Sequence, residues 1–349
     1  MAIIDKPSDY FNTILYSGTG NENARTGVNF QPDWVWIKQR NGSTNQMLTD
    51  SVRGATKTLH SQNTDTESTD AQALKSFNSD GFTVGTDGDV NTSSDTYVAW
   101  NWLAGTSFTN DASATGIGTI DSTGSASDTS GFSIVSYTGT GSAGTIKHGL
   151  NSAPNMIIQK NRDETQPWWV WHSSLTGANS YLRLNGTNAE GTDGAALWNS
   201  TLPTSSVFSV GDNTGINGSA DKCIAYCFND VQGYSKFGSY TGNGNADGPF
   251  VYTGFKPAFV MVKLSSGADD WQVLDNKRSP INIVGGYLRP NSSGATVSND
   301  VIDFLSNGFK LRASSGSWNA NGSTFIFMAF AENPFVTSTS NGSIPATAR

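Results

Sequence analysis

Cys-Ile-Ala-Tyr-Cys-Phe, at Cys223–Phe228, is the stretch that decides the fold, because it occurs in three versions. Tyr97–Trp102 reads Tyr-Val-Ala-Trp-Asn-Trp, and Phe325–Phe330 reads Phe-Ile-Phe-Met-Ala-Phe. Residues alternate sides along a β-strand, and in every version the even-numbered residues are large and mostly apolar. Burying one such side chain contributes roughly 1.5–3 kcal/mol. We therefore predict that each stretch is the closing strand of a separate domain, with its even-numbered face in that domain's own core.

Two further patterns recur in the same order in each part of the chain. A tyrosine followed by Ser or Thr, Gly, any residue and Gly ends a β-prone run at Tyr16–Gly20, Tyr137–Gly141 and Tyr240–Gly244. Further on, a proline opens an apolar strand that ends in lysine, at Pro32–Lys38, Pro154–Lys160 and Pro257–Lys263. Patterns that keep their order and spacing while the connecting loops vary are typical of tandem repeats.

The repeats set the predicted domain boundaries. Repeat 1 covers residues 1–105, repeat 2 covers 131–232 and repeat 3 covers 233–335. Residues 106–130 are rich in Gly, Ser and Thr, which predicts a loose linker. Residues 336–349 are predicted to form a polar C-terminal tail.

The composition favours short strands over long helices. Charged residues make up 14% of the 349 residues, and there are 38 glycines. Turn-bounded short strands indicate an all-β protein of three tandem antiparallel β-sandwiches, of the lectin-like jelly-roll type. Only Thr69–Phe77 and Asn299–Leu305 are predicted to form short helical turns.

The charge and the N-terminus exclude several kinds of partner. A net charge of −8 with scattered Lys and Arg argues against binding to nucleic acid. No apolar stretch approaches the roughly 20 residues of a membrane span, so we expect no membrane insertion. The N-terminus lacks a basic region followed by an apolar run, so we expect no signal peptide.

Catalytic and metal sites are not indicated by the sequence. A glycosidase needs two carboxylates across one bond, yet none of the five glutamates lies beside another acid at strand spacing, and Asp269 and Asp270 should point to opposite faces. The three histidines, His60, His148 and His172, occupy different places in their repeats. Cys223 and Cys227 are too far apart on one strand for a disulfide. We predict no catalytic residue, no cofactor and no metal, and the ligand-binding residues are left unassigned.

Two segments leave alternatives open. Asp87–Asn91 spaces oxygen ligands as a calcium loop begins, but no glutamate completes it, so an ordinary turn is the alternative. Trp168, Trp169 and Trp171 place indoles on both faces of one strand. One of these indoles is a candidate to stack on a sugar ring at the surface; the alternative is packing between domains or subunits.

Several segments also carry a resemblance to a known family. They are Met1–Phe11, Phe30–Lys38, Ser79–Phe82, Tyr97–Trp102, Tyr234–Gly242 and Pro345–Arg349. Together they resemble tandem-repeat virion structural proteins of marine tailed bacteriophages, which are described as tail-fibre-like or lectin-like. The resemblance covers essentially the whole chain.

The resemblance implies a place and a set of partners. We expect a non-enzymatic virion structural protein on the particle exterior, of the tail-fibre or appendage type, that takes part in host attachment by binding a host surface glycan. A capsid decoration protein is the alternative, and a polysaccharide-degrading glycosidase is the less favoured one. The implied partners are other virion proteins and copies of itself, with a trimer as the usual symmetry of phage appendages. The implied location is the virion, assembled in the host cytoplasm.

Overall fold

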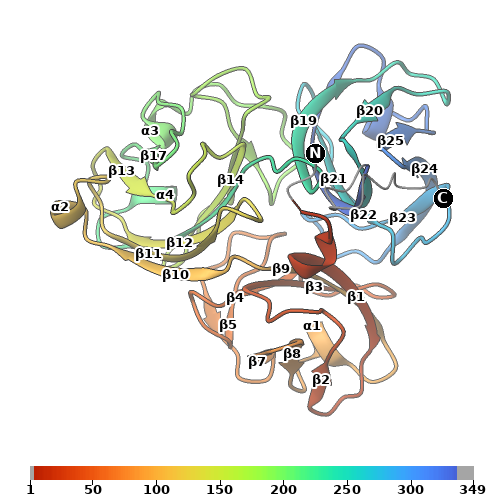
Figure 1. Cartoon of the computed structure of the whole chain (residues 1–349), viewed down its shortest axis with the longest axis horizontal. Helices are drawn as coiled ribbons and strands as arrows, with labels where there is room; N and C mark the ends of the chain where they lie inside the picture. Colours follow the sequence, from red (N-terminus) through yellow and green to blue (C-terminus); the bar gives the residue numbers. More distant parts are fainter. Residues whose placement is uncertain (1–3, 336–349) are drawn as a thin grey trace.

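The computed structural model describes residues 4–335, and its regular structure is almost entirely antiparallel β-sheet. Figure 1 shows three lobes around a common centre, coloured from red to blue in chain order. The helices of the described residues are single turns of three or four residues. The predicted C-terminal tail lies outside the described residues. The all-β prediction is confirmed at this level.

Repeat 1 contains two sheets packed face to face. The larger has the order β1-β9-β3-β4, and the smaller has the order β2-β8-β7. The bounds are η1 Pro7–Asp9, β1 Phe11–Ser17, β2 Asn23–Arg25, β3 Trp34–Gln39, β4 Met47–Asp50, β5 Lys57–Thr58, β6 Ser68–Thr69, β7 Leu74–Asn78, β8 Gly81–Val84, α1 Gly88–Asn91 and β9 Thr96–Trp102.

Repeat 2 follows the same plan with an extended sheet. Its strand order is β10-β11-β12-β18-β14-β15-β16, and β13 pairs with β17. The bounds are β10 Thr106–Asn110, α2 Ala112–Thr115, β11 Ser122–Ser127, β12 Phe132–Thr138, β13 Gly144–Lys147, β14 Met156–Asn161, β15 Trp169–His172, β16 Leu182–Arg183, α3 Ala195–Trp198, β17 Val207–Val210, α4 Thr214–Asn217 and β18 Lys222–Phe228.

Repeat 3 has two four-stranded sheets. Their orders are β19-β26-β21-β22 and β20-β25-β24-β23. The bounds are β19 Ser235–Thr241, β20 Phe250–Tyr252, β21 Phe255–Leu264, β22 Trp271–Asp275, β23 Val284–Tyr287, β24 Val297–Leu305, β25 Gly308–Leu311, α5 Gly316–Asn319 and β26 Thr324–Pro334.

The two faces of the closing strands β9, β18 and β26 are buried in different cores. The odd-numbered residues pack within their own repeat, as Ala99, Ala225 and Ala329 do. The even-numbered residues of all three strands meet in one cluster, which we call the central cluster. Its members from these strands are Val98, Trp100, Trp102, Ile224, Tyr226, Phe228, Ile326, Met328 and Phe330.

The prediction that each even-numbered face lies in its own repeat's core is therefore wrong. Rings from different repeats are in direct contact: Trp34 stacks on Tyr226 at 4.5 Å, and Phe11 stacks on Phe330 at 5.0 Å. The larger side chains are needed at the centre, because three sheets that meet around an axis leave a wide space to fill. The repeats thus share one continuous core in addition to their own.

The same contact closes each seam between repeats. A residue at the start of β22, or directly before β4 or β15, donates from its side chain to a backbone carbonyl in the neighbouring repeat. Trp168 Nε1 donates to His60 O at 2.8 Å, Trp271 Nε1 to Arg183 O at 2.9 Å, and Gln46 Nε2 to Arg289 O at 3.0 Å. Repeat 2 thus donates to repeat 1, repeat 3 donates to repeat 2, and repeat 1 donates to repeat 3. The single chain is therefore a closed ring with approximate threefold symmetry.

Two local predictions are also wrong. The predicted linker 106–130 contains β10 and β11, which extend the sheet of repeat 2 through β12. Its small residues suit a strand here, because a Cβ on Gly124 would lie 2.2 Å from the Ile134 carbonyl oxygen. The predicted helical turns at Thr69–Phe77 and Asn299–Leu305 contain most of β7 and most of β24. Pairing of these segments with β8 and β25 outweighs their local helix signal.

Candidate functional site

Two exposed aromatic side chains lie on one face of β20. Phe250 is 45% exposed and Tyr252 is 61% exposed, whereas Val251 between them packs into the core of repeat 3. Alternate residues of a strand share a face and lie about 7 Å apart, so the two rings form neighbouring surfaces. The corresponding strands β2 and β13 have no aromatic residue. The aromatic pair is therefore particular to repeat 3.

Charged groups lie beside this pair on the same outer sheet. Lys310 on β25 pairs with Phe250, and Asp303 on β24 pairs with Lys310. The Lys310 ammonium donates to the Asp247 carboxylate at 2.8 Å, and this bond lowers the pKa of Asp247. Arg312 Nε forms a 2.5 Å ion pair with Asp303. We call Phe250, Tyr252, Asp303, Lys310 and Arg312 the β20 face.

The three tryptophans that were candidates for sugar stacking are buried. Trp168 is fully buried in the central cluster, and Trp169 and Trp171 pack inside repeat 2. Trp168 stacks on Tyr226 and donates to repeat 1, so the alternative of packing between repeats holds for it.

The segment Asp87–Asn91 forms the α1 turn. Asp87 caps the helix by accepting from Asp89 N, and the Asp89 carboxylate accepts from Asn45. The Asn91 amide is buried and donates to the carbonyls of Gly85 and Asn21. These oxygens are committed to protein hydrogen bonds and do not converge, and no group of three or more His, Cys, Asp or Glu in residues 4–335 is arranged to hold a metal.

The repeated tyrosine-and-glycine pattern is a structural clamp. Tyr16, Tyr137 and Tyr240 each donate from the hydroxyl to a carbonyl of the short helix in their repeat, at 2.6–2.8 Å. A Cβ on Gly18 would lie 2.1 Å from the Thr92 carbonyl oxygen, so only glycine allows this approach. The backbone after each glycine is held by a buried asparagine. These asparagines are Asn91, Asn217 and Asn319. From the sequence, Asn91 was a candidate only as part of the possible calcium loop, and the other two were not candidates.

Two histidines, His148 and His172, and both cysteines have internal roles. Burial lowers the pKa of His148 and of His172 to about 4, and each contacts a backbone carbonyl through Nε2. Burial raises the pKa of Cys223 to about 12 and the pKa of Cys227 further still, and both thiols are free. Neutral imidazoles and protonated thiols at these positions are packing groups, because neither faces solvent.

Two carboxyl groups do lie close together in repeat 1. Burial raises the pKa of Asp87 to about 6, and the Asp70 carboxylate adds to the rise because only protonated Asp87 can donate a hydrogen bond to it. Asp87 is already engaged as the cap of α1, and Asp70 directly follows β6. The pair has no equivalent in the other repeats, where Asn213 and Ser315 occupy the cap position.

The lysine next to the last residue of each central strand, β3, β14 and β21, is completely buried, which the sequence pattern alone did not show. The Nζ atoms of Lys38, Lys160 and Lys263 donate only to uncharged groups, mainly the backbone carbonyls of the following loop. Burial lowers the pKa of all three lysines to about 8. Each ammonium holds its loop against the end of the central cluster.

The family model described as a domain of unknown function, DUF7483, matches residues 6–334. The chain belongs to the DUF7483 family. The match begins before β1 and ends in β26, so the DUF7483 domain spans all three repeats and the central cluster. Comparisons with curated proteins and with solved structures gave no significant match. No helix in the described part of this DUF7483 chain is long and apolar enough to cross a membrane.

Proposed function

We propose that this DUF7483 protein is a non-enzymatic structural protein on the exterior of a bacteriophage particle, of the tail-fibre or appendage type. In this proposal three jelly-roll-like sandwiches form a rigid body, and the β20 face binds a host surface glycan. The observation that carries the binding proposal is the exposed pair Phe250 and Tyr252 beside charged hydrogen-bonding groups. Sugars present C–H faces that stack on aromatic rings and hydroxyls that bond to charged side chains.

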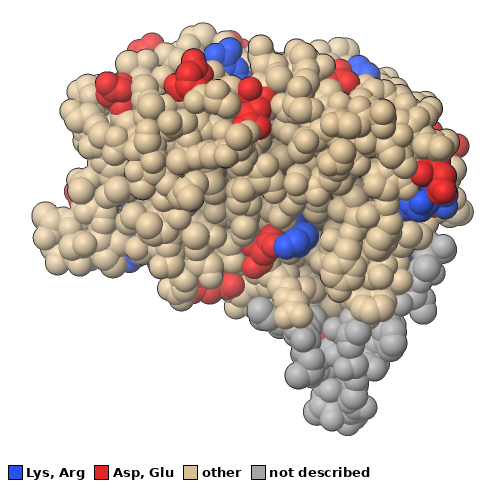
Figure 2. Space-filling model, turned by 90° about the horizontal axis from the view of Figure 1, so that it is seen from above, with Lys and Arg blue, Asp and Glu red and all other residues tan. Residues whose placement is uncertain are grey.

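The distribution of the ionisable groups supports a role without catalysis. The buried lysines and histidines bond to protein groups, and the perturbed carboxyl Asp87 is a helix cap. On the face drawn in Figure 2, charged residues are scattered over a largely uncharged surface. That pattern supports a partner other than nucleic acid. Modest affinity per site would become strong attachment through many copies on one particle.

A glycan array probed with the full-length chain tests the binding proposal. We expect Tyr252→Ala and Phe250→Ala to weaken binding about tenfold each, since about 1.4 kcal/mol of stacking is lost. Leu202→Ala is the control, because Leu202 is 55% exposed but lies in repeat 2. Binding that is unchanged by both aromatic substitutions would exclude the β20 face.

The location is tested separately, by labelled antibody on intact particles. Label on tail appendages supports the proposal, and label over the capsid supports the alternative of a decoration protein. Release of reducing sugar from host envelope material by the purified chain would instead favour a glycosidase. The trimer remains a proposal for the assembled particle, and sedimentation of the purified chain tests it.

A further inference from the structure

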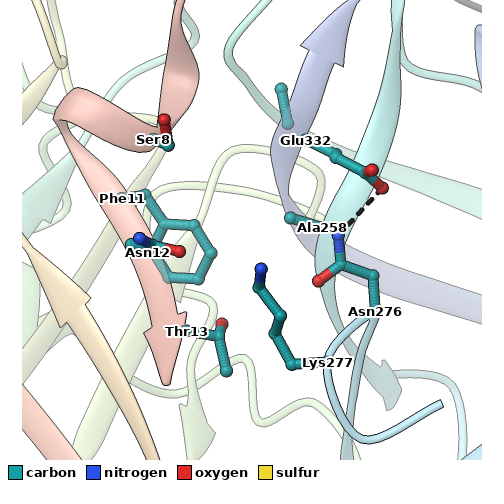
Figure 3. Close-up of a pocket in the computed structure, with 9 residues that line it drawn as sticks. Ser8, Phe11, Asn12, Thr13, Ala258, Asn276, Lys277 and Glu332 are labelled. Atoms are coloured by element: carbon teal, nitrogen blue, oxygen red, sulfur yellow. Dashed lines mark hydrogen bonds between the residues drawn. The ribbon is translucent and has the colours of Figure 1, made fainter. Parts of the chain in front are cut away.

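Three side chains of complementary chemistry meet near the end of β26, where the sheet of repeat 3 faces repeat 1. The Glu332 carboxylate lies 3.5 Å from Lys256 Nζ through one oxygen and 2.8 Å from Asn276 Nδ2 through the other. Lys256 is 7% exposed and Asn276 is 4% exposed. Figure 3 shows the bond between Glu332 and Asn276 at the edge of a small cavity. One partly exposed carboxylate therefore bridges a buried amine and a buried carboxamide.

An irregularity in the sheet creates this arrangement. Lys256 pairs with Asn333 and Pro257 pairs with Ala331, so the register skips Glu332 and the strand pair has a bulge there. A bulge turns a side chain away from the direction that regular pleating would give it. Here the bulge brings Glu332 to Lys256 and to Asn276, which directly follows β22.

Repeat 3 alone has this set of residues. At the positions equivalent to Lys256, Asn276 and Glu332, repeat 1 has Gln31, Ser51 and Ala104, and repeat 2 has Ala153, Ser173 and Asp230. The trio is therefore not a requirement of the repeat fold. The residues at these positions in repeats 1 and 2 are therefore substitutions that the repeat fold tolerates.

We propose that Lys256 and Asn276 form an intramolecular isopeptide bond, promoted by Glu332. A Lys amine is a nucleophile once it is neutral, and its attack is favoured when both reactants are held in one geometry. The side-chain carbonyl oxygen of Asn276 is buried and has no hydrogen-bond partner in the described structure. No hydrogen bond to this oxygen therefore has to break when Nζ attacks Cγ. The bond would tie β21 to the end of β22.

The reaction balances without an oxidant or any other reagent. Glu332 takes one proton from the Lys256 ammonium, and the neutral Nζ attacks Cγ of Asn276 to form the new N–C bond. Glu332 then passes its proton to Nδ2, and the Cγ–Nδ2 bond breaks to release ammonia. Glu332 transfers the second proton lost from Nζ to this ammonia, which becomes ammonium. The products are the secondary amide and ammonium, and the Glu332 carboxylate is regenerated. The adjoining cavity of about 70 Å³, lined by Phe11, Thr13 and Lys277 among others, gives the released ammonia a way out.

Mass spectrometry of the purified, folded, full-length chain tests the proposal directly. Loss of one ammonia lowers the intact mass by about 17 Da. Trypsin does not cut the Lys256–Pro257 bond, so the unlinked chain yields residues 237–263 and 264–277 as separate peptides. We expect these two peptides to appear as one cross-linked species, with fragment ions that place the link at Lys256 and Asn276.

Single substitutions assign the roles of the three residues. Lys256→Arg, Asn276→Ser and Glu332→Gln should each restore the full mass and the separate peptides, and Asn276→Ser introduces the residue that repeats 1 and 2 have. Lys277→Arg is the matched control: Lys277 lines the same cavity, and its replacement should leave the link intact. Two separate peptides from the folded wild-type chain would overturn the proposal, as would a link that survives Asn276→Ser. The result does not depend on the proposed virion role, since it is read from the purified chain.

Discussion

The buried carboxylate of Asp50 in repeat 1 accepts a 2.7 Å hydrogen bond from the hydroxyl of Tyr226 in repeat 2. The equivalent pair at another seam is Asp275 and Trp100, whose Nε1 donates at 3.0 Å. At the remaining seam the strand residue is Met328, which has no donor, and the facing position is His172. A buried carboxylate thus occurs where the neighbouring repeat supplies a donor, and a neutral imidazole where it does not. At each seam, the residue at the end of β4, β15 or β22 therefore matches the hydrogen-bonding capacity of the side chain that faces it from the next repeat.

We expect Tyr226→Phe to destabilise the protein by about 1–2 kcal/mol, because Asp50 loses one of its donors while it stays buried. Arg53 still pairs with Asp50 at 2.5 Å, so the carboxylate keeps a charged partner and the loss stays moderate. Urea denaturation followed by tryptophan fluorescence measures the change. Tyr181→Phe is the control, since Tyr181 bonds Asp193 near the surface of repeat 2 and touches no other repeat through its hydroxyl. An equal loss of unfolding free energy in both variants would mean that the contact between repeats stabilises the protein no more than a surface hydrogen bond does.

The shared core predicts that the repeats fold together. Residues 106–232 alone would expose Phe132, Met156, Trp168 and Phe228, which are at most 1% exposed in the full chain. We expect this fragment to lack a dispersed amide proton NMR spectrum, and the full chain to unfold in a single transition by fluorescence and by circular dichroism. A well-dispersed spectrum from the fragment would show that the central cluster is dispensable for folding of repeat 2.

The sequence was sufficient to find the closing strands β9, β18 and β26 but not to say what covers them. Alternation in Tyr97–Trp102 shows that both faces are suited to burial, yet periodicity does not distinguish a repeat's own core from a shared one. The strands at residues 106–127 were missed because Ser and Gly have low strand propensity, and only pairing with β12 makes them regular.

The candidate sites depend even more on tertiary structure. Phe250 and Phe259 are the same residue type in two consecutive strands, β20 and β21, which belong to different sheets, but one is 45% exposed and the other 1%. The trio of Lys256, Asn276 and Glu332 spans 77 residues of sequence, from 256 to 332, and is assembled by a bulge that no local pattern indicates. The tyrosine-and-glycine motif was visible, whereas its asparagine partner Asn91 was not, because a single buried asparagine has no periodic signal.

Asp87→Asn should stabilise the protein above about pH 6. The folded-state pKa of Asp87 is raised from 3.8 to about 6 by burial and by Asp70, so the folded state binds more protons between these values and stability falls as pH rises through them. Asparagine keeps the cap, as Asn213 does in repeat 2. Because Asp87 is partly exposed, we expect a gain of about 1 kcal/mol at pH 7–8 and none below about pH 4. Thermal unfolding at several pH values measures it.

The matched control for that prediction is Asp80→Asn. Hydrogen bonds from the backbone of Gly27 and Asn29 lower the pKa of Asp80, so its carboxylate is favoured by folding. This substitution should therefore lower the stability at neutral pH, the opposite direction. A gain in both variants would indicate that only the reduced net negative charge matters.

The three buried lysines predict that stability rises with pH in the alkaline range. Their folded-state pKa is about 8, whereas a lysine in the unfolded chain titrates near 10.4, so between these values the unfolded state binds more protons. The unfolding free energy should increase from about pH 8 to about pH 10 by roughly 1–3 kcal/mol per lysine. The increase is smaller where water reaches the ammonium group through the loop. Above about pH 10 the trend should reverse, because the buried tyrosines, among them Tyr137 and Tyr226, have raised pKa values and resist ionisation in the folded state.

Urea denaturation at half-unit pH steps measures this slope, and one pair of variants assigns it. Lys160→Met should remove about a third of the rise, since one of three equivalent groups no longer titrates, and it should also lower the stability because the carbonyls of Asn161 and Glu164 lose their donor. Lys222→Met in the same repeat should leave the slope unchanged, because Lys222 is exposed. Stability that stays flat between pH 8 and 10 in the wild-type chain would mean that the folded state hydrates these ammonium groups, and the loops after β3, β14 and β21 would then have to open to water.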